Sequence, residues 1–132
     1  MKNVIIVLSI LSTIFFLSAC HDHDDDTLYE VTINIVKPSS GASVTKGVLM
    51  PIEVNFSRPD KTIHNVLIQI LDSNNSVVET ILDKHAHVTS TFTYNESAAY
   101  KPTTSGTFKL KATTTDDNKN QPNVKEITFT VN

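Results

Sequence analysis

Three histidines have the spacing of potential metal ligands in this sequence. His85 and His87 lie two positions apart in an alternating run, so in a β-strand both rings would project from one face, with their Cα atoms about 6.5 Å apart. Asp83 has the same parity, and His64 lies just before another apolar run. Imidazole commonly binds Zn²⁺ and Cu²⁺, and three protein ligands with one open position make a metal site. One hypothesis is therefore a Cu or Zn site formed by His85, His87 and His64.

A solvated surface position is the simpler explanation of the same histidines. Val88, Phe92 and Tyr94 would occupy the opposite face of the strand, which leaves both rings pointing to solvent. A His-x-His pair alone is a weak motif, so we take solvated residues as the default interpretation and the metal site as the alternative. His21 and His23 could add ligands, but ordering the tail that carries them would cost about 1–2 kcal/mol per residue.

The loop that begins at Asp116 is a second candidate site. It offers oxygen ligands from Asp116, Asp117, Asn118 and Asn120, and Ca²⁺ takes about six to eight such ligands. The spacing matches no EF-hand, so a solvated turn is the default interpretation. The sequence has no glycine-rich phosphate loop, no His-Glu-x-x-His and no Gly-x-Ser-x-Gly motif. We therefore expect a protein that is not an enzyme and has no cofactor, unless the histidines bind Cu or Zn.

The segments that would hold these side chains have the pattern of β-strands. Apolar residues recur at every second position in 29–35 and 48–56, which is the period of a half-buried strand. Pro51 cannot donate a ladder hydrogen bond, so a strand edge or a strand start is expected there. No stretch has a useful length of helical periodicity. The pattern predicts about seven short strands, near residues 29–35, 48–56, 65–71, 77–82, 85–94, 108–112 and 127–131.

Turn-forming residues separate the predicted strands. Arg58–Lys61 has the composition of a turn, Asp72–Ser76 that of a hairpin connection, and Asn95–Ser105 that of a loop. Threonine is abundant, tryptophan is absent and glycine is scarce, which favours β structure over a helical bundle. Short strands with regularly spaced turns are typical of an antiparallel sandwich.

Several motifs resemble bacterial surface Ig-like domains. The stretch Ser105–Ala112 resembles their penultimate strand, although Phe108 stands where those domains often have the tyrosine of a tyrosine corner. An Ile-x-x-Pro-x-x-Gly motif at residues 35–41 resembles their opening strand. Together with His85-Ala86-His87, these motifs make residues 30–132 similar to a group of Bacteroidota Ig-like lipoproteins. The resemblance implies an all-β fold, a single Ig-like antiparallel β-sandwich of about seven strands.

The first twenty residues resemble the signal peptide of a bacterial lipoprotein. Lys2 precedes an apolar run, Val4–Leu17, which is too short to span a bilayer but has the length of a signal-peptide core. The Leu-Ser-Ala-Cys ending resembles a lipobox, which implies cleavage before Cys20 and acylation of its thiol and new amino group. Cys20 is the only cysteine, so it has no intrachain disulfide partner. An uncleaved membrane anchor is the alternative.

The residues after the cysteine are strongly acidic. Asp22, Asp24, Asp25 and Asp26 resemble the Asp-rich export signal of Bacteroidota surface lipoproteins. That resemblance implies a lipid-anchored outer-membrane protein that faces the cell surface. A plain solvated spacer, on a protein at the periplasmic face, is the alternative.

The charge balance excludes one class of partner. Removal of residues 1–19 leaves 113 residues, with 10 basic and 14 acidic side chains and a net charge of −4. The four aspartates after the cysteine supply all of that charge, so the remainder is neutral and has no basic cluster. A nucleic-acid partner is therefore not expected.

The predicted organisation is a signal peptide (1–19), a lipidated cysteine with an acidic linker (20–27) and one Ig-like domain (28–132). The predicted function is that of a non-enzymatic surface lipoprotein whose domain is a binding or accessory module of the cell envelope, with a protein or glycan partner. The alternative is a Cu- or Zn-binding lipoprotein that uses the His-x-His strand.

Overall fold

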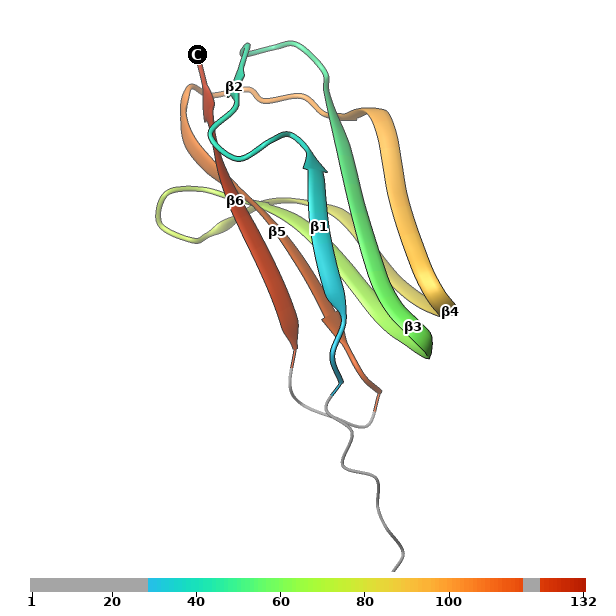
Figure 1. Cartoon of the computed structure of the whole chain (residues 1–132). Helices are drawn as coiled ribbons and strands as arrows, with labels where there is room; N and C mark the ends of the chain where they lie inside the picture. Colours follow the sequence, from blue (N-terminus) through green and yellow to red (C-terminus); the bar gives the residue numbers. More distant parts are fainter. Residues whose placement is uncertain (1–28, 118–121) are drawn as a thin grey trace, which may run out of the picture.

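The computed structural model describes residues 29–117 and 122–132, and this part of the chain is all-β (Figure 1). The predicted fold, an Ig-like antiparallel β-sandwich, is confirmed. No helix among these residues is long and apolar enough to cross a membrane. Cys20 and the four aspartates after it lie outside the described residues. The strands are β1 (Thr32–Lys37), β2 (Ser43–Val44), β3 (Met50–Leu71), β4 (Val77–Tyr100), β5 (Gly106–Thr115) and β6 (Asn123–Val131).

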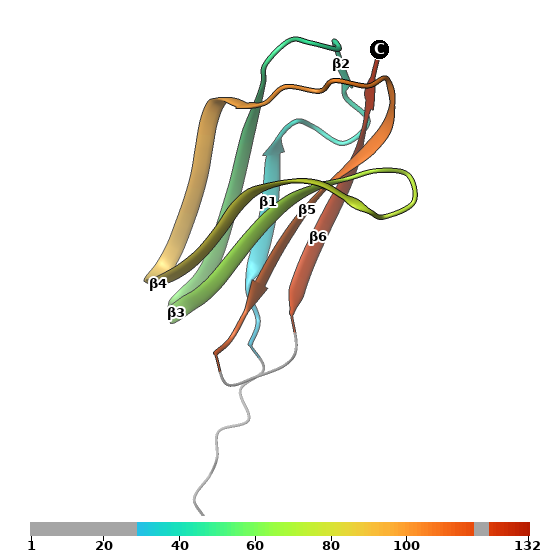
Figure 2. The same cartoon turned by 180° about the vertical axis from the view of Figure 1, so that it is seen from behind.

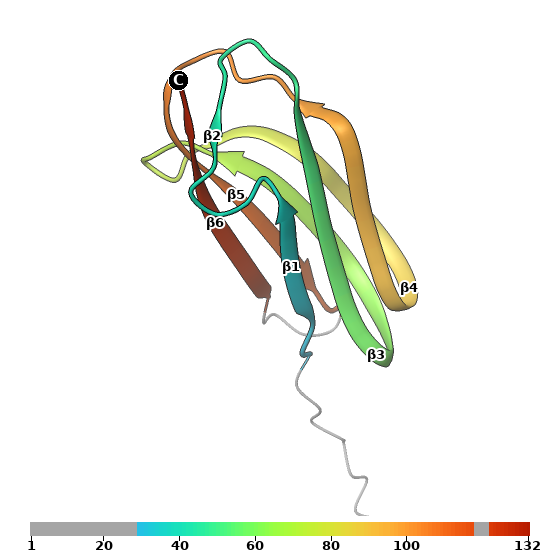
Figure 3. The ribbon, with the colours of Figure 1, turned by 45° about the horizontal axis from the view of Figure 1, so that its top comes forward.

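Two long strands, β3 and β4, pass through both layers of the sandwich. The first arm of β3 pairs with β1 and its second arm pairs with β5, while β4 follows β3 as an antiparallel partner along nearly its whole length. The two strands bend together, as Figure 3 shows. One layer is therefore β1, β3 and β4, and the other is β4, β3, β5 and β6, with β2 parallel to the end of β6.

The bend explains why seven strands were predicted. The predicted strands 48–56 and 65–71 correspond to the two arms of β3. The predicted strand 77–82 lies in the arm of β4 that pairs with the second arm of β3, whereas the predicted strand 85–94 runs through the corner of β4. The corner lies at the predicted turn Arg58–Lys61, where Asp60 has a φ of 58° and Ser90 of the facing strand has a φ of 70°. The Arg58 guanidinium closes the corner by donating a hydrogen bond to the Thr62 carbonyl at 2.8 Å.

The predicted hairpin between β3 and β4 is present and projects from the body of the sandwich (Figure 2). Asp72 Oδ1 accepts hydrogen bonds from the backbone N–H groups of Asn74 and Ser76 at 2.8 and 2.9 Å. Asn75 adopts a φ of 65°, which its short polar side chain tolerates. The connection therefore forms from local side-chain chemistry.

The predicted loop Asn95–Ser105 is wrong in its first half. Residues 95–100 continue β4, because Tyr100 pairs with Met50 and Glu96 pairs with Ile52. The register shifts between Met50 and Ile52, at the position of Pro51. The proline therefore lies at the start of β3, as expected for a residue that cannot donate to the ladder.

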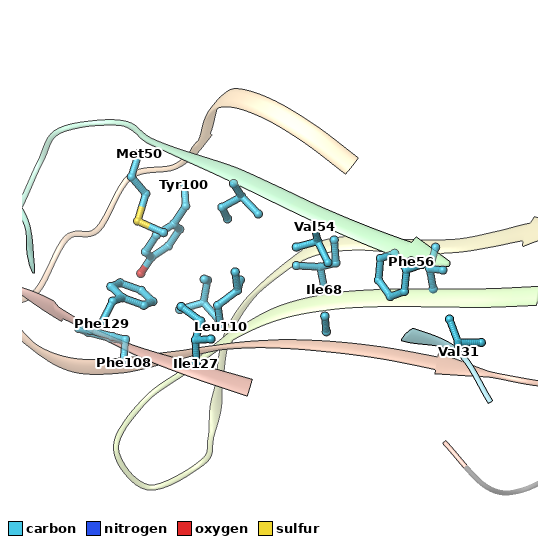
Figure 4. Close-up of a cluster of buried hydrophobic side chains, with 14 of the residues drawn as sticks. Val31, Met50, Val54, Phe56, Ile68, Tyr100, Phe108, Leu110, Ile127 and Phe129 are labelled. Atoms are coloured by element: carbon cyan, nitrogen blue, oxygen red, sulfur yellow. The ribbon is translucent and has the colours of Figure 1, made fainter. Parts of the chain in front are cut away.

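The core lies between the two layers and is mostly apolar, with the side chain of Tyr100 packed into it (Figure 4). Alternation along each strand places every second side chain inside, and the phenylalanine of the tyrosine-corner position, Phe108, stacks on Phe129 at 5.9 Å between ring centroids. Phe92 is only partly buried and packs against Phe56 from the outside of the cluster. The fully buried apolar side chains include Ile52, Val54, Phe56, Ile63, Val66, Ile68, Ile70, Leu110, Phe129 and Val131.

Candidate metal centre

A β-bulge brings the histidines of β3 and β4 together. Between the paired positions 63/88 and 65/85, β3 has one residue, His64, whereas β4 has two, Ala86 and His87. The extra residue forces His87 into a left-handed conformation with a φ of 48°. Histidine tolerates this region better than most residues but still at a cost of about 1 kcal/mol, and such strain is concentrated at functional sites.

The orientation of the three rings decides which of them could share an ion. The rings of His64 and His87 are perpendicular, with centroids 5.0 Å apart. The rings of His85 and His87 are stacked, with centroids 4.9 Å apart and an angle of 25°. Imidazole binds a metal through a lone pair that lies in the ring plane. A donor atom of His64 and one of His87 lie within 4.8 Å of each other, and His85 is not part of this group, so His64 and His87 are the pair suited to one ion.

Asp117, two residues beyond the end of β5, supplies a carboxylate to the same point. Its Oδ2 lies 3.0 Å from His64 Nδ1 and 4.0 Å from His87 Nδ1. Its Oδ1 lies 3.7 Å from His85 Nδ1. A carboxylate only accepts hydrogen bonds, so His64 Nδ1 carries the proton of the 3.0 Å contact. One carboxylate therefore faces all three histidines.

Asn65 connects the carboxylate to the remaining histidine. Its Nδ2 donates to Asp117 Oδ1 at 2.8 Å, and its Oδ1 accepts a hydrogen bond from His85 Nδ1, also at 2.8 Å. Because the amide oxygen cannot donate, the proton of His85 lies on Nδ1. The amide thus holds Asp117 and His85 on either side of β3.

Tyr29, at the start of the described chain, fixes the backbone under the site. Its hydroxyl oxygen accepts a hydrogen bond from the His64 N–H at 3.1 Å and also bonds to Thr114 Oγ1 at 2.9 Å. The Arg58 guanidinium lies over its ring, 4.4 Å from the centroid. The buried Tyr29 therefore joins the segment before β1 to β3 and β5 beside the histidines.

The site is open to solvent and its carboxylate favours the ionised form. The side chains of His85 and His87 are 56% and 58% exposed, and those of Asp117 and His64 are 35% and 17% exposed. Partial desolvation raises the pKa of Asp117, but hydrogen bonds from His64 and Asn65 and the positive charges of His85 and His64 together lower it further. The pKa of Asp117 consequently lies below its ordinary value.

The donor atoms are close to the spacing that a transition metal requires. One ligand atom from each of His64, His87 and Asp117 lies within 4.8 Å of the others. Bonds of about 2.0–2.2 Å in a tetrahedron place the donors about 3.4 Å apart, so small side-chain rotations suffice. Two imidazoles and one carboxylate form a known ligand set for Zn²⁺.

The structure brings the three predicted histidines together, but the three residues with mutually close donor atoms are not the three that were predicted. Asp117 takes the third place in the group of mutually close donors, and His85 and Asp83 are outside it. Asp117 was predicted only as part of a Ca²⁺ loop, of which residues 118–121 lie outside the described residues. His21 and His23 also lie outside them. The signal that could have found Asp117 is strand adjacency, since β5 pairs with residues 65–71 and ends beside Asn65.

Comparisons with known proteins show the fold and leave the activity open. No protein-family model matches the chain, and no curated protein matches it in sequence. Among solved structures, the chain is similar to a β-glucosidase from Listeria innocua in complex with glucose, with 13% identity, 77% of this chain covered and a TM-score of 0.51. The chain spans only 16% of that enzyme.

A second similar structure is a CARDB domain from Pyrococcus furiosus in complex with di-metal ions. The identity is 17%, the alignment covers 77% of this chain and 92% of that domain, and the TM-score is 0.46. A similarity of this degree has no bearing on whether the present chain binds metal. The site is therefore judged on its own geometry.

Proposed function

We propose that this protein is a lipid-anchored, non-enzymatic binding module of the bacterial envelope, and that its ligand is a transition-metal ion, Zn²⁺ or Cu²⁺. One observation carries the metal proposal: the perpendicular rings of His64 and His87 face the same oxygen of Asp117. The anchor rests on the lipobox-like residues that end at Cys20 and on the acidic stretch after it.

The donor chemistry supports Zn²⁺ or Cu²⁺ over Ca²⁺. Calcium usually binds about six to eight oxygen ligands, whereas two of the three donors here are imidazole nitrogens. Imidazole binds both Zn²⁺ and Cu²⁺, and Cu²⁺ generally binds a given site more tightly than Zn²⁺. The apolar core is complete without an ion, so the metal is a ligand of the folded domain and not its scaffold.

The strained backbone supports a functional role for His87. A solvated surface position gives no reason to keep a side chain at a φ of 48°, where glycine would be free of strain. A ligand role gives such a reason, because the bulge turns the His87 ring toward His64 and Asp117.

Calorimetric titration with Zn²⁺ or Cu²⁺ tests the proposal on a version of the chain that starts at Thr27, which excludes His21, His23 and the acidic stretch. We expect one ion per chain, and we expect a His64→Ala, His87→Ala double variant to lose this binding. His85→Ala is the matched control and should retain an affinity within about tenfold of the wild type. Weak binding without defined stoichiometry that survives the double variant would leave the histidines as surface residues.

A protein or glycan partner is the second candidate ligand of the module. It is favoured by the unpaired edge of β4, which pairs only with β3 among the described strands. Exposed backbone donors and acceptors of this kind can accept an added strand. Replacing Thr91 and Thr93 with proline should abolish such binding without affecting the ion, and capture of envelope proteins by the wild type and the proline variant would measure it.

A further inference from the structure

Among the residues that the structure describes, three supply the donors available to an ion at this site. Over residues 29–117 and 122–132, His64, His87 and Asp117 form the only group of three or more histidine, cysteine or carboxylate side chains with mutually close donor atoms. Zn²⁺ ordinarily binds four ligands, and sites with three protein ligands carry water or another molecule in the fourth position.

His85 lies beside the site but is held in a position that does not suit it for the fourth place. Its Nδ1 is engaged by Asn65 Oδ1 at 2.8 Å. Its ring is stacked on His87 at an angle of 25°, so the in-plane lone pairs of the two rings do not converge. Ligation through Nδ1 would break the hydrogen bond to Asn65, and Nε2 does not belong to the group of mutually close donor atoms. We therefore assign Asn65 the role of a positioning residue, which holds Asp117 toward His64, and we place His85 outside the metal ligands.

Charge and exposure determine what would fill the vacant coordination position. A divalent ion with two neutral imidazoles and one carboxylate retains a net charge of +1, which favours an anion over a neutral donor. His87 is 58% exposed and Asp117 is 35% exposed, so a molecule from solution can reach the ion. The buried side of the site is occupied by Tyr29 and the backbone of His64.

We propose that the ion held by His64, His87 and Asp117 keeps one coordination position open toward solvent, and that this position binds a small monodentate anion in exchange for water. The inference rests on the metal-binding function proposed above. The exchange forms one metal–anion bond and releases one water molecule, with no change of oxidation state. The site would thus recognise an anion through the ion.

The test uses the full-length protein in detergent micelles, loaded with Co²⁺, whose visible absorption reports its coordination. Titration with azide should change the spectrum with saturation at one azide per bound ion. His85→Ala should bind Co²⁺ and respond to azide as the wild type does. Asp117→Asn should lose the ion and the azide response together. Because this variant keeps His21 and His23, any Co²⁺ binding that remains in it is binding by those two histidines.

The outcomes separate the two proposals. A protein that binds one Co²⁺ but shows no saturable azide response has a filled coordination sphere, which overturns the open position alone. An azide response that appears only after His85→Ala identifies His85 as the fourth ligand and overturns it as well. Absence of stoichiometric Co²⁺ binding overturns the metal site itself. Acetate in place of azide should also change the spectrum with saturation at one anion per ion, because a carboxylate can bind through one oxygen.

Discussion

His87 allows backbone strain and ligand function to be measured separately. Its φ of 48° is unfavourable for any residue with a Cβ atom, whereas His85 has no such conformation. Glycine at position 87 removes the strain, but glycine in an ordinary strand position is destabilising. The two histidines of one His-x-His motif should therefore respond to the same substitution in opposite ways.

We expect His87→Gly to leave the stability of the metal-free domain unchanged or to raise it by up to about 1 kcal/mol, and to abolish ion binding. His85→Gly should lower stability by about 0.5–1 kcal/mol and retain the ion. Urea denaturation and calorimetric titration measure the two effects. An equal loss of stability in both variants would mean that the His87 side chain stabilises the domain and is not kept for binding.

The affinity of the domain for Zn²⁺ should depend on pH because two of the proposed ligands are histidines. Imidazole must be deprotonated to bind a metal, so affinity should fall as the pH is lowered. With two imidazole ligands the fall should approach roughly 100-fold per pH unit. Zn²⁺ affinities measured at pH 7.5, 6.5 and 5.5 test this. A constant affinity across these values would exclude imidazole ligands.

The lowered pKa of Asp117 has its own consequence for the metal-free domain. The folded state holds this proton less tightly than the unfolded state, so the stabilisation is complete above the unfolded pKa of about 4 and is lost as pH falls through the lower folded value. We expect Asp117→Asn to weaken the loss of stability as the pH falls below about 4. Chemical denaturation of the wild type and the variant at a series of pH values measures it.

At the scale of the strands, alternation predicted which side chains face the core but not which strands are continuous. The apolar period of 48–56 and 65–71 identified both arms of β3, because burial on one face fixes the parity of a strand. The bend between them depends on Asp60 and on Ser90 of another strand, which no local pattern connects. The same limit applies to the site. The histidines were visible as a motif, whereas Asp117 is 53 residues from His64 and joins it only through the pairing of β3 with β5.

Truncation of aromatic residues should separate the centre of the core from its margin. Phe56 and Phe129 are fully buried, so replacing either with alanine should cost about 3–5 kcal/mol. Phe92 packs against Phe56 from outside and is only partly buried, so Phe92→Ala should cost less, about 1–2 kcal/mol. Denaturant unfolding of the three variants gives the values. A cost for Phe92→Ala equal to that for Phe56→Ala would contradict the placement of β4 at the margin.

At the scale of the whole molecule, the candidate metal centre lies at the end where the chain enters the domain. β1 begins, β5 ends and β3 and β4 bend at one end, while the C-terminus is at the other (Figure 1). Tyr29 contacts His64 directly and is nine residues from Cys20. A chain of nine residues reaches at most about 30 Å. Anchoring through a lipid on Cys20 would therefore keep the ion close to the membrane surface.

The anchor itself is tested by Cys20→Ser. The proposed lipid would attach through the sulfur of Cys20, so the variant should incorporate no fatty-acid analogue and should not partition with membranes. Metabolic labelling followed by membrane fractionation measures both. Cys20→Ser keeps the acidic residues after the cysteine and so does not test them. A second variant keeps Cys20 and has asparagine in place of Asp22, Asp24, Asp25 and Asp26. Its exposure at the cell surface is compared with that of the wild type. Equal labelling of Cys20→Ser and wild type would remove the anchor and every consequence of it.

The position of the tether should determine how readily the ion reaches the membrane. In one sample the lipid proposed on Cys20 holds the domain on vesicles that contain a metal-chelating headgroup. In the other, a version that starts at Thr27 is coupled to the same vesicles through a cysteine added after Asn132, at the opposite end of the sandwich (Figure 1). Both tethers raise the effective concentration of the domain at the surface, so a difference between them reports orientation. We expect faster transfer of Zn²⁺ to the chelating lipid from the N-terminal tether, because it places the site of His64, His87 and Asp117 toward the bilayer. Equal rates would show that the domain turns freely on its linker and that the end at which the ion binds has no defined relation to the membrane.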